Sequence, residues 1–229
     1  YKPTGEIVGF GRAAPFRGYS GAWELGGLIV APVHRCRDVA KEMTMLRILE
    51  IRNQHGRVVI SEPVCYRADY ASQRNLIKYQ FALLGIQPGK YPDIQHEILR
   101  DQPESVLMAA RWLEGQSGFG DRKIFLPQAY RGLLYTFMPR EIHQRCWDIV
   151  LGGTMPPAHH HPGHREGQKV GSEFIDVPAN WPESAGTIEH YMAEGYRFAC
   201  VLPAFGELTD GTRFDYIRMH RLPKDVVSF

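Results

Sequence analysis

The residues best placed to do chemistry in this sequence follow an apolar stretch, Leu25–Val30. This stretch is too short for a helix and rich in strand-forming residues, and Pro32 ends it because proline has no N–H to donate. From Val39 onward, apolar residues recur every three to four positions, which predicts an amphipathic helix. The turn between the strand and the helix carries two cations, Arg35 and Arg37.

This order of strand, basic turn and helix is suited to binding a phosphate group. The first N–H groups of a helix have no partner within the helix, and its N-terminus carries a partial positive charge. An anion at that position is therefore stabilised, and guanidinium groups add charge-assisted hydrogen bonds to it. The expected apolar face of the helix consists of Val39, Met43, Leu46, Leu49 and Ile51.

The turn resembles the acyl-CoA diphosphate loop of the GNAT superfamily of N-acyltransferases, in which Arg or Gln is followed by two residues, Gly, one residue, and Gly or Ala. The corresponding residues here are Arg35, Cys36, Arg37, Asp38, Val39 and Ala40. Asp38 therefore stands where the family has its first glycine. This departure has three readings: weaker CoA binding, a different acyl carrier, or an aspartate that points away and caps the helix.

The resemblance implies roles for further residues. The backbone of Leu28, Ile29 and Val30 would hold the pantetheine arm, and Asn75 stands close to an asparagine that contacts CoA in the family. Glu24 occupies the position from which family members deprotonate the acceptor amine, which identifies it as the candidate general base. The usual tyrosine acid is replaced by phenylalanine, Phe81, which has no proton to donate.

The elements expected in residues 1–114 make up a GNAT-like half that lacks the opening strand and first two helices of the family. Strands are predicted at Gly5–Arg12, Arg57–Ile60 and Glu104–Leu113. A helix is predicted over Ala71–Leu84, with Gly85 as its C-terminal stop. The sequence from Leu84 to Ile86 resembles the leucine-glycine-phenylalanine corner of the family.

Residues 122–229 are expected to form a second, degenerate GNAT-like half, so the predicted fold class is α/β with a mixed twisted sheet of GNAT type. A helix over Ser184–Glu194 ends at Gly195 and is followed by two strands, which repeats the order at the end of the first half. The other expected elements are strands at Lys123–Leu126, Glu173–Val177, Tyr196–Leu202 and Asp215–Leu222, short helical stretches at Tyr130–Met138 and Arg140–Val150, and an irregular segment over Thr154–Gly171.

Composition restricts the partners. Lys and Arg number 27 against 25 Asp and Glu, so bulk charge indicates no nucleic-acid partner. No apolar run approaches the roughly 20 residues needed to span a bilayer, and the four scattered cysteines favour a reduced, cytoplasmic compartment. The sequence begins at Tyr1, so upstream sequence is expected. His159, His160 and His161 are adjacent in a Pro/Gly-rich segment, a spacing unsuited to a zinc site, and no metal is predicted.

The function implied by the resemblance is transfer of an acyl group from acetyl-CoA or another acyl-CoA to a small-molecule or peptide amine. Two alternatives remain. In the first, Asp38 and Phe81 mark a non-catalytic GNAT-like binding or regulatory module. In the second, the donor is an acyl carrier protein that docks on arginines: Arg12, Arg17, Arg35 and Arg37.

Overall fold

The structure, a computed structural model, describes residues 5–16, 21–65, 70–91, 104–113, 122–133, 147–152, 164–166, 173–210 and 212–222. The first half contains β1 (Gly9–Pro15), β2 (Ala22–Val30), α1 (Val39–Asn53), β3 (Val58–Ser61), α2 (Tyr70–Lys78), β4 (Ala82–Tyr91) and β5 (Glu104–Trp112). The second half contains β6 (Arg122–Pro127), β7 (Trp147–Gly152), β8 (His164–Glu166), β9 (Glu173–Pro178), α5 (Ser184–Ala193), β10 (Arg197–Glu207) and β11 (Arg213–Arg221). The chain is an α/β protein, as predicted.

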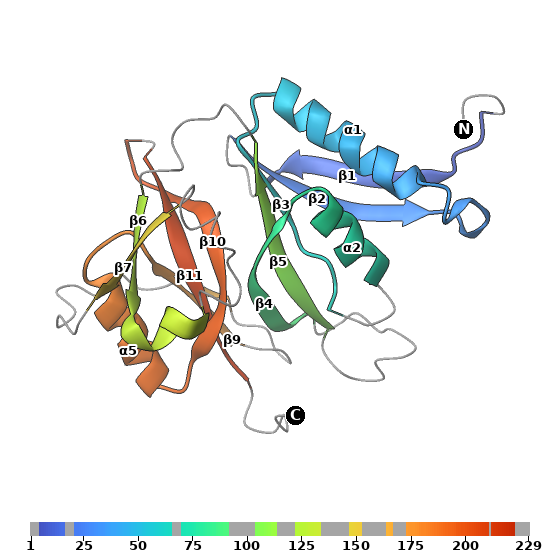
Figure 1. Ribbon diagram of the computed structural model, residues 1–229. Helices are drawn as coiled ribbons and strands as arrows, with labels where there is room; N and C mark the ends of the chain where they lie inside the picture. Colours follow the sequence, from blue (N-terminus) through green and yellow to red (C-terminus); the bar gives the residue numbers. More distant parts are fainter. Residues whose placement is uncertain are drawn as a thin grey trace.

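Within these ranges, nine strands form one mixed sheet in the order β1-β2-β3-β5-β4-β10-β11-β9-β8. β2 and β3 run parallel and are joined by α1, whereas their outer neighbours β1 and β5 are antiparallel to them. A parallel pair needs a crossover connection, and the predicted strand–turn–helix unit supplies it. In Figure 1, α1 and α2 lie on the sheet of the first half, and α5 lies beside β6 and β7, which pair with each other in parallel.

The strands of the first half contribute to two apolar cores, because successive side chains of a strand point to opposite faces. Val59 of β3 packs with Ile51 of α1 and Leu76 of α2 in the smaller cluster. Val58 and Ile60 belong instead to a larger cluster, which also contains residues of α5, β6, β9, β10 and β11. Burial of this face of the first half therefore depends on the second half.

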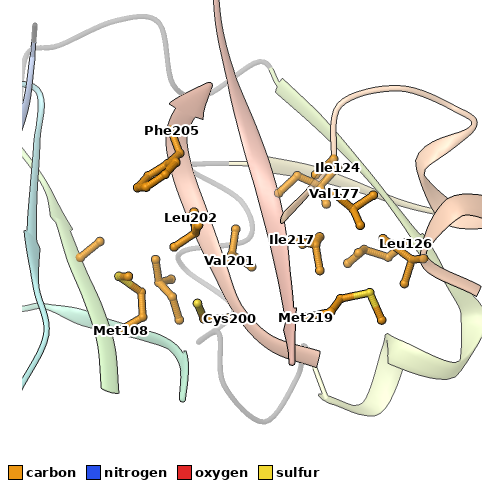
Figure 2. Packing of buried hydrophobic residues seen from close by; sticks show 14 of the residues in the cluster. Met108, Ile124, Leu126, Val177, Cys200, Val201, Leu202, Phe205, Ile217 and Met219 are labelled. Carbon is orange, nitrogen blue, oxygen red and sulfur yellow. The ribbon is translucent and has the colours of Figure 1, made fainter. Parts of the chain in front are cut away.

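The two halves meet between β4 and β10. Figure 2 shows Met108 of β5 facing Cys200 and Leu202 of β10 across this boundary. Among the described residues, the two strands pair in register at Gly85 and Cys200. Gly85 has a φ of +138°, and a Cβ atom there would lie 2.1 Å from the carbonyl oxygen of Ala199. Only glycine allows this approach of the two backbones.

The buried face of α1 differs from the predicted one. Thr44, Ile48 and Ile51 are buried, whereas Leu46 is 59% exposed and Leu49 is 46% exposed. Apolar residues occupy most of the circumference of α1, so their spacing alone does not define which side meets the sheet. Burial of the polar Thr44 is tolerated because its hydroxyl donates to the carbonyl oxygen of Ala40 at 2.9 Å.

The predicted end of α2 at Gly85 is wrong. The helix ends at Lys78, and Gln80 takes the left-handed conformation with a φ of +59°. The N–H of Phe81 then donates to the carbonyl oxygen of Leu76, a bond that closes a helix C-terminus. The apolar run before Gly85 therefore belongs to β4 and not to the helix, and the predicted corner from Leu84 to Ile86 lies within that strand.

In the second half, the strands β6, β9 and β11 and the helix α5 lie where they were predicted, and β10 extends five residues further, to Glu207. Two predictions are wrong in part. The expected helical stretch Arg140–Val150 ends in a strand from Trp147, which pairs with β6. The expected irregular segment Thr154–Gly171 contains the short strand β8, which pairs with β9. The remaining residues of both stretches lie outside the described residues.

Candidate functional site

A cleft opens where the parallel strands β2 and β3 part. The two strands pair over Ala22–Glu24 and Val58–Ile60, after which β2 continues to Val30 beside β1 while β3 ends at Ser61. The hydroxyl of Ser61 donates to the carbonyl oxygen of Leu25 at 3.0 Å, just beyond the last paired residues. The divergence exposes backbone groups of both strands, which a ligand can use as hydrogen-bond partners.

The cleft has a volume of about 240 Å³ and is lined by residues of β2, of β3 and the segment after it, and of the helices α1 and α2. Its floor and walls combine apolar side chains with a few polar ones, the composition typical of a ligand site. The lining residues are Leu25, Gly26, Gly27, Leu28, Ile29, Thr44, Arg47, Ser61, Glu62, Pro63, Val64, Ser72, Asn75 and Leu76. Of the residues predicted to bind a cofactor, three therefore line this cleft: Leu28, Ile29 and Asn75.

Asn75 and Thr44 connect α2 to α1 across the cleft. The side-chain amide of Asn75 donates to the hydroxyl oxygen of Thr44 at 2.8 Å. Directly after the end of α2, the hydroxyl of Tyr79 donates to the carbonyl oxygen of Lys41 at 2.7 Å. These two bonds hold the helices at a fixed separation, so the cleft is a preformed feature of the fold.

Arg47 is a cleft residue that the sequence reasoning missed. Its guanidinium donates to the carbonyl oxygens of Arg12 at 3.0 Å and Gly26 at 3.2 Å. These bonds tie α1 to β1 and β2, just beyond the last residue of β2 that pairs with β3. Burial lowers the pKa of Arg47, because a charged guanidinium loses solvation there. An arginine side chain remains charged despite such a shift, so a cation stands in the wall of the cleft.

The predicted diphosphate turn connects the end of β2 to the start of α1. The guanidinium of Arg35 donates through Nε to the carbonyl oxygen of Val30 at 3.2 Å. Cys36 and Asp38 both have left-handed backbones, with φ values of +60° and +58°. Asp38 is the N-cap residue of α1, and its carboxylate makes no capping hydrogen bond. Of the three readings of Asp38, the one in which its side chain caps the helix has no support here.

The left-handed backbone of Asp38 is the conformation for which glycine is the usual residue. The aspartate thus adopts a backbone that the glycine of the family pattern would also allow. The turn residues Arg35, Cys36, Arg37, Asp38, Val39 and Ala40 follow Val30 directly along the chain, and none of them lines the cleft itself.

Glu24, the predicted base, lies in the paired part of β2 opposite Ile60 of β3. Its carboxylate accepts a hydrogen bond from the guanidinium of Arg12 at 2.9 Å, and it does not line the cleft. Arg12, one of the four arginines of the predicted docking face, is therefore engaged in an ion pair. Arg17, another of them, lies outside the described residues.

Glu62 is a second carboxylate at the cleft that the sequence reasoning missed. It follows β3 directly and lines the cleft, and its side chain is 9% exposed. It forms an ion pair with Lys90, and accepts hydrogen bonds from the amide of Gln87 at 2.9 Å and the hydroxyl of Tyr91 at 3.2 Å. The available signal was a carboxylate placed between the end of the strand Val58–Ser61 and Pro63.

The environment of Glu62 keeps its carboxylate charged. Burial by itself would raise the pKa of Glu62, but the charge of Lys90 and hydrogen bonds from Lys90 and Gln87 outweigh burial, so the pKa is lowered. Burial and the neighbouring carboxylates of Glu62, Glu24 and Glu104 raise the pKa of Tyr91. Tyr91 therefore stays protonated and donates to Glu62 at neutral pH.

Phe81 is buried in the core beneath α1 and α2 and lies outside the cleft wall.

Within the described residues, no group of three His, Cys, Asp or Glu side chains is arranged to hold a metal ion. The histidines His159, His160 and His161 lie outside the described residues. In the part of the chain that the structure covers, no helix combines the length and the apolar character required to cross a membrane.

No protein-family model matches this chain, and no curated protein matches it. Its structure is similar to GNAT acetyltransferases over about half of the chain. The ribosomal-protein-alanine N-acetyltransferase of Brucella melitensis shares 22% identity with a TM-score of 0.40, over 48% of this chain and 64% of that one. An N-acetyltransferase of Staphylococcus aureus Mu50 shares 18% with a TM-score of 0.41, over 48% of this chain and 63% of that one.

A GNAT family acetyltransferase of Elizabethkingia anophelis, solved with acetyl-CoA bound, shares 16% identity with a TM-score of 0.39. That similarity covers 47% of this chain and 70% of the other. The chain thus spans less than two thirds of the length of the first two proteins. With TM-scores this low, the function has to be argued from the residues of this chain.

Proposed function

We propose that the chain transfers an acyl group from an acyl-CoA thioester, such as acetyl-CoA, to an amine. The observation that carries the proposal is the cleft between the diverging strands β2 and β3, followed along the chain by a basic turn at the N-terminus of α1. The backbone of Leu28–Val30 would hold the pantetheine arm. The turn Arg35–Ala40 would hold the diphosphate, and the thioester carbonyl would lie in the gap between the strands.

The proposed reaction is a direct displacement that needs no covalent enzyme intermediate. The amine nitrogen forms a bond to the thioester carbon, the carbon–sulfur bond breaks, and CoA leaves as the thiolate. The nitrogen loses one proton, which a carboxylate at the cleft accepts, and the thiolate takes a proton from water. Thiols have a pKa near 8.5, so the thiolate leaves without an enzymatic acid such as the tyrosine that Phe81 replaces. Alignment of the two reactants supplies the remaining catalysis.

We further propose that the second half is a degenerate repeat of the first. This is supported by the strand–helix–strand–strand order of β3-α2-β4-β5 and of β9-α5-β10-β11. The lateral order within the sheet is also the same, with the last strand of each set lying between the other two.

The proposed function is tested by titrating the protein with acetyl-CoA in a thermal unfolding experiment and in calorimetry. A ligand that binds only the folded state stabilises it by RT ln(1 + [L]/Kd), about 2.7 kcal/mol at a hundredfold excess over Kd. We expect a saturable increase in Tm and turnover with an amine. A shift without turnover would indicate the non-catalytic binding module. Turnover with an acyl carrier protein alone, weakened by salt, would indicate the other donor.

A further inference from the structure

A chain of buried polar side chains runs from the second half into the cleft of the first. Arg218 of β11 donates twice to the carboxylate of Asp176 on β9, at 2.7 Å each, and donates through Nη1 to the amide oxygen of Gln87 at 2.9 Å. Gln87 in turn donates to Glu62, the carboxylate in the cleft wall, at 2.9 Å. Lys90, also on β4, forms an ion pair with the same carboxylate of Glu62.

This chain is almost completely removed from water. The side chains of Arg218 and Asp176 are 2% and 3% exposed, and Gln87 is fully buried. A buried ion pair costs desolvation free energy that its own attraction offsets only in good geometry, and apolar residues often serve stability equally well. Within this network, the charges of the two carboxylates, Asp176 and Glu62, are balanced by those of Arg218 and Lys90. Stability of the boundary between the two halves does not by itself explain why these polar groups are buried there.

A neighbouring pair on the same two strands provides the contrast. Arg221 of β11 pairs with Glu173 of β9, and the side chains of this pair are 44% and 30% exposed to solvent. The pair of Arg218 and Asp176 has the same chemistry, but it is buried and extends through Gln87 to Glu62. The two pairs therefore differ in burial.

The consequence for Glu62 is a fixed orientation. An ionised carboxylate has about four acceptor positions, and Gln87, Lys90 and Tyr91 occupy three of them. The amide of Gln87 can present its N–H₂ to Glu62 only if its oxygen points the other way, toward a donor. Arg218 is that donor, and because a guanidinium has donors only, it determines which way the amide is turned.

We propose that Arg218 is a positioning residue for the cleft: through Gln87 it holds the Glu62 carboxylate in the orientation that receives a cationic acceptor amine. This inference rests on the proposed function and adds to it the class of acceptor and a role for the second half. The amine arrives as an ammonium ion beside a charge that is already oriented. It loses one proton to water, which makes the nitrogen nucleophilic, and it loses the second proton to the carboxylate as the bond to the thioester carbon forms.

The test uses the full chain with two variants that interrupt the link and one that does not. Gln87→Met removes the amide at nearly constant size. Arg218→Met combined with Asp176→Leu replaces the buried pair with apolar groups, which avoids an uncompensated buried charge. Arg221→Met, on the same strand, is the control. We expect both linking variants to raise the KM for the acceptor about tenfold or more, with the Kd for acetyl-CoA within about twofold of the original. The control should change neither.

A second readout follows the Glu62 carboxyl directly, by carbon-13 NMR titration in the absence of substrates. The titratable and charged groups that act on Glu62 are Lys90 and Tyr91 of β4 and Arg218 of β11. Two further carboxylates, Glu24 of β2 and Glu104 of β5, act on Tyr91. We expect the titration midpoint of Glu62 to rise in Gln87→Met and to stay unchanged in Arg221→Met.

The two readouts separate this inference from the proposed function. If the protein neither binds acetyl-CoA nor transfers an acyl group, the proposed function fails, and the NMR titration alone decides whether the link through Gln87 acts on Glu62. An unchanged midpoint in Gln87→Met would overturn the inference. An acceptor KM equal to that of the original protein in both linking variants of an active enzyme would overturn it as well.

Discussion

The proposed donor site depends on single residues of the turn before α1. Arg35 and Arg37 supply two positive charges, whereas Asp38 places a negative charge at the same helix N-terminus. The backbone of Asp38 is left-handed, so the aspartate occupies a conformation that glycine adopts at lower cost. The side-chain charge of Asp38 would affect anion binding, and its backbone conformation would affect the stability of the turn. A substitution at Asp38 measured at two salt concentrations separates these two effects.

Removing the two arginines together should weaken acetyl-CoA binding. Each charge-assisted hydrogen bond to a phosphate contributes about 1.5–3 kcal/mol, so Arg35→Ala with Arg37→Ala should cost a few kcal/mol of binding free energy in calorimetry. Arg52→Ala, at the other end of α1, is the matched control and should bind as before. Equal affinity in the double variant and the control would rule out the turn as the donor site.

Asp38→Gly should act in the opposite direction. It removes a like charge from the proposed position of the diphosphate, and it replaces a left-handed aspartate with glycine, which adopts that backbone at lower cost. The affinity for acetyl-CoA should therefore increase. The measurement is the Kd at low and at moderate salt, because an effect of the aspartate charge should shrink as salt screens it. A higher Kd for acetyl-CoA in Asp38→Gly would indicate that the Asp38 carboxylate contributes to binding.

Glu24 and Glu62 are the two carboxylates that we compare as the general base. If Glu24 takes the proton from the amine, Glu24→Gln should lower kcat by about 10²–10⁴-fold with little change in the KM for the donor. Glu62→Gln provides the comparison, because Glu62 lines the cleft while Glu24 is paired with Arg12. Normal turnover in Glu24→Gln, with loss of turnover in Glu62→Gln, would transfer the role of base to Glu62.

At the scale of elements, the strand β4 is the junction between the halves. One of its residues, Gly85, allows close approach to β10, and two others, Gln87 and Lys90, reach the carboxylate at the end of β3. The strand begins only four residues after α2, because Gln80 turns the chain with a left-handed backbone. The position of β4 thus links the boundary between the halves to the cleft.

Gly85→Ala should destabilise the protein by a few kcal/mol. The new methyl group would lie 2.1 Å from the carbonyl oxygen of Ala199 and 2.6 Å from Cα of Cys200, and the backbone φ is one that alanine rarely adopts. Gly132→Ala, whose Cβ would meet no atom of the described residues within 4 Å, should change the free energy of unfolding by less than about 0.5 kcal/mol. Urea unfolding measures both. Similar values for the two variants would show that the β4–β10 contact is not required.

At the scale of the whole molecule, the larger core joins the two halves into one unit. It contains residues from strands on both sides of the β4–β10 boundary, as Figure 2 shows for Met108 and Cys200. Apolar burial is the main favourable contribution to folding, so neither half keeps its full core without the other. The buried polar chain from Asp176 to Glu62 crosses the same boundary.

This arrangement predicts how stability depends on pH. Because the pKa of Glu62 is lowered in the folded protein, its charged form stabilises the fold above the ordinary carboxyl pKa of about 4.3. That contribution is lost as the pH falls through the lower pKa of the folded state. The difference in unfolding free energy between the original protein and Glu62→Gln should therefore narrow from pH 7 to about pH 3, as measured by urea unfolding. A difference that is independent of pH would contradict the assigned direction.

Local sequence patterns determined much of the first half and the order of elements in the second. The strand Leu25–Val30, the basic turn and the helix from Val39 follow from short-range rules: strand formers in a short run, a proline that ends pairing, and apolar spacing near 3.6. The strands at Val58–Ser61 and Glu104–Trp112 were also predicted, because buried runs of β-branched and apolar residues need no distant partner to be recognised.

Tertiary contacts decided the rest. The buried side of α1 is the side that the sheet covers, and apolar residues around the whole helix left that choice open. The end of α2 was mispredicted because Gln80, not a glycine, takes the left-handed conformation. The setting of Glu62 could not be predicted, because Arg218 lies 131 residues from Gln87 along the chain. A hydrogen bond between residues so far apart leaves no periodicity in the sequence, since only folding brings the two side chains together.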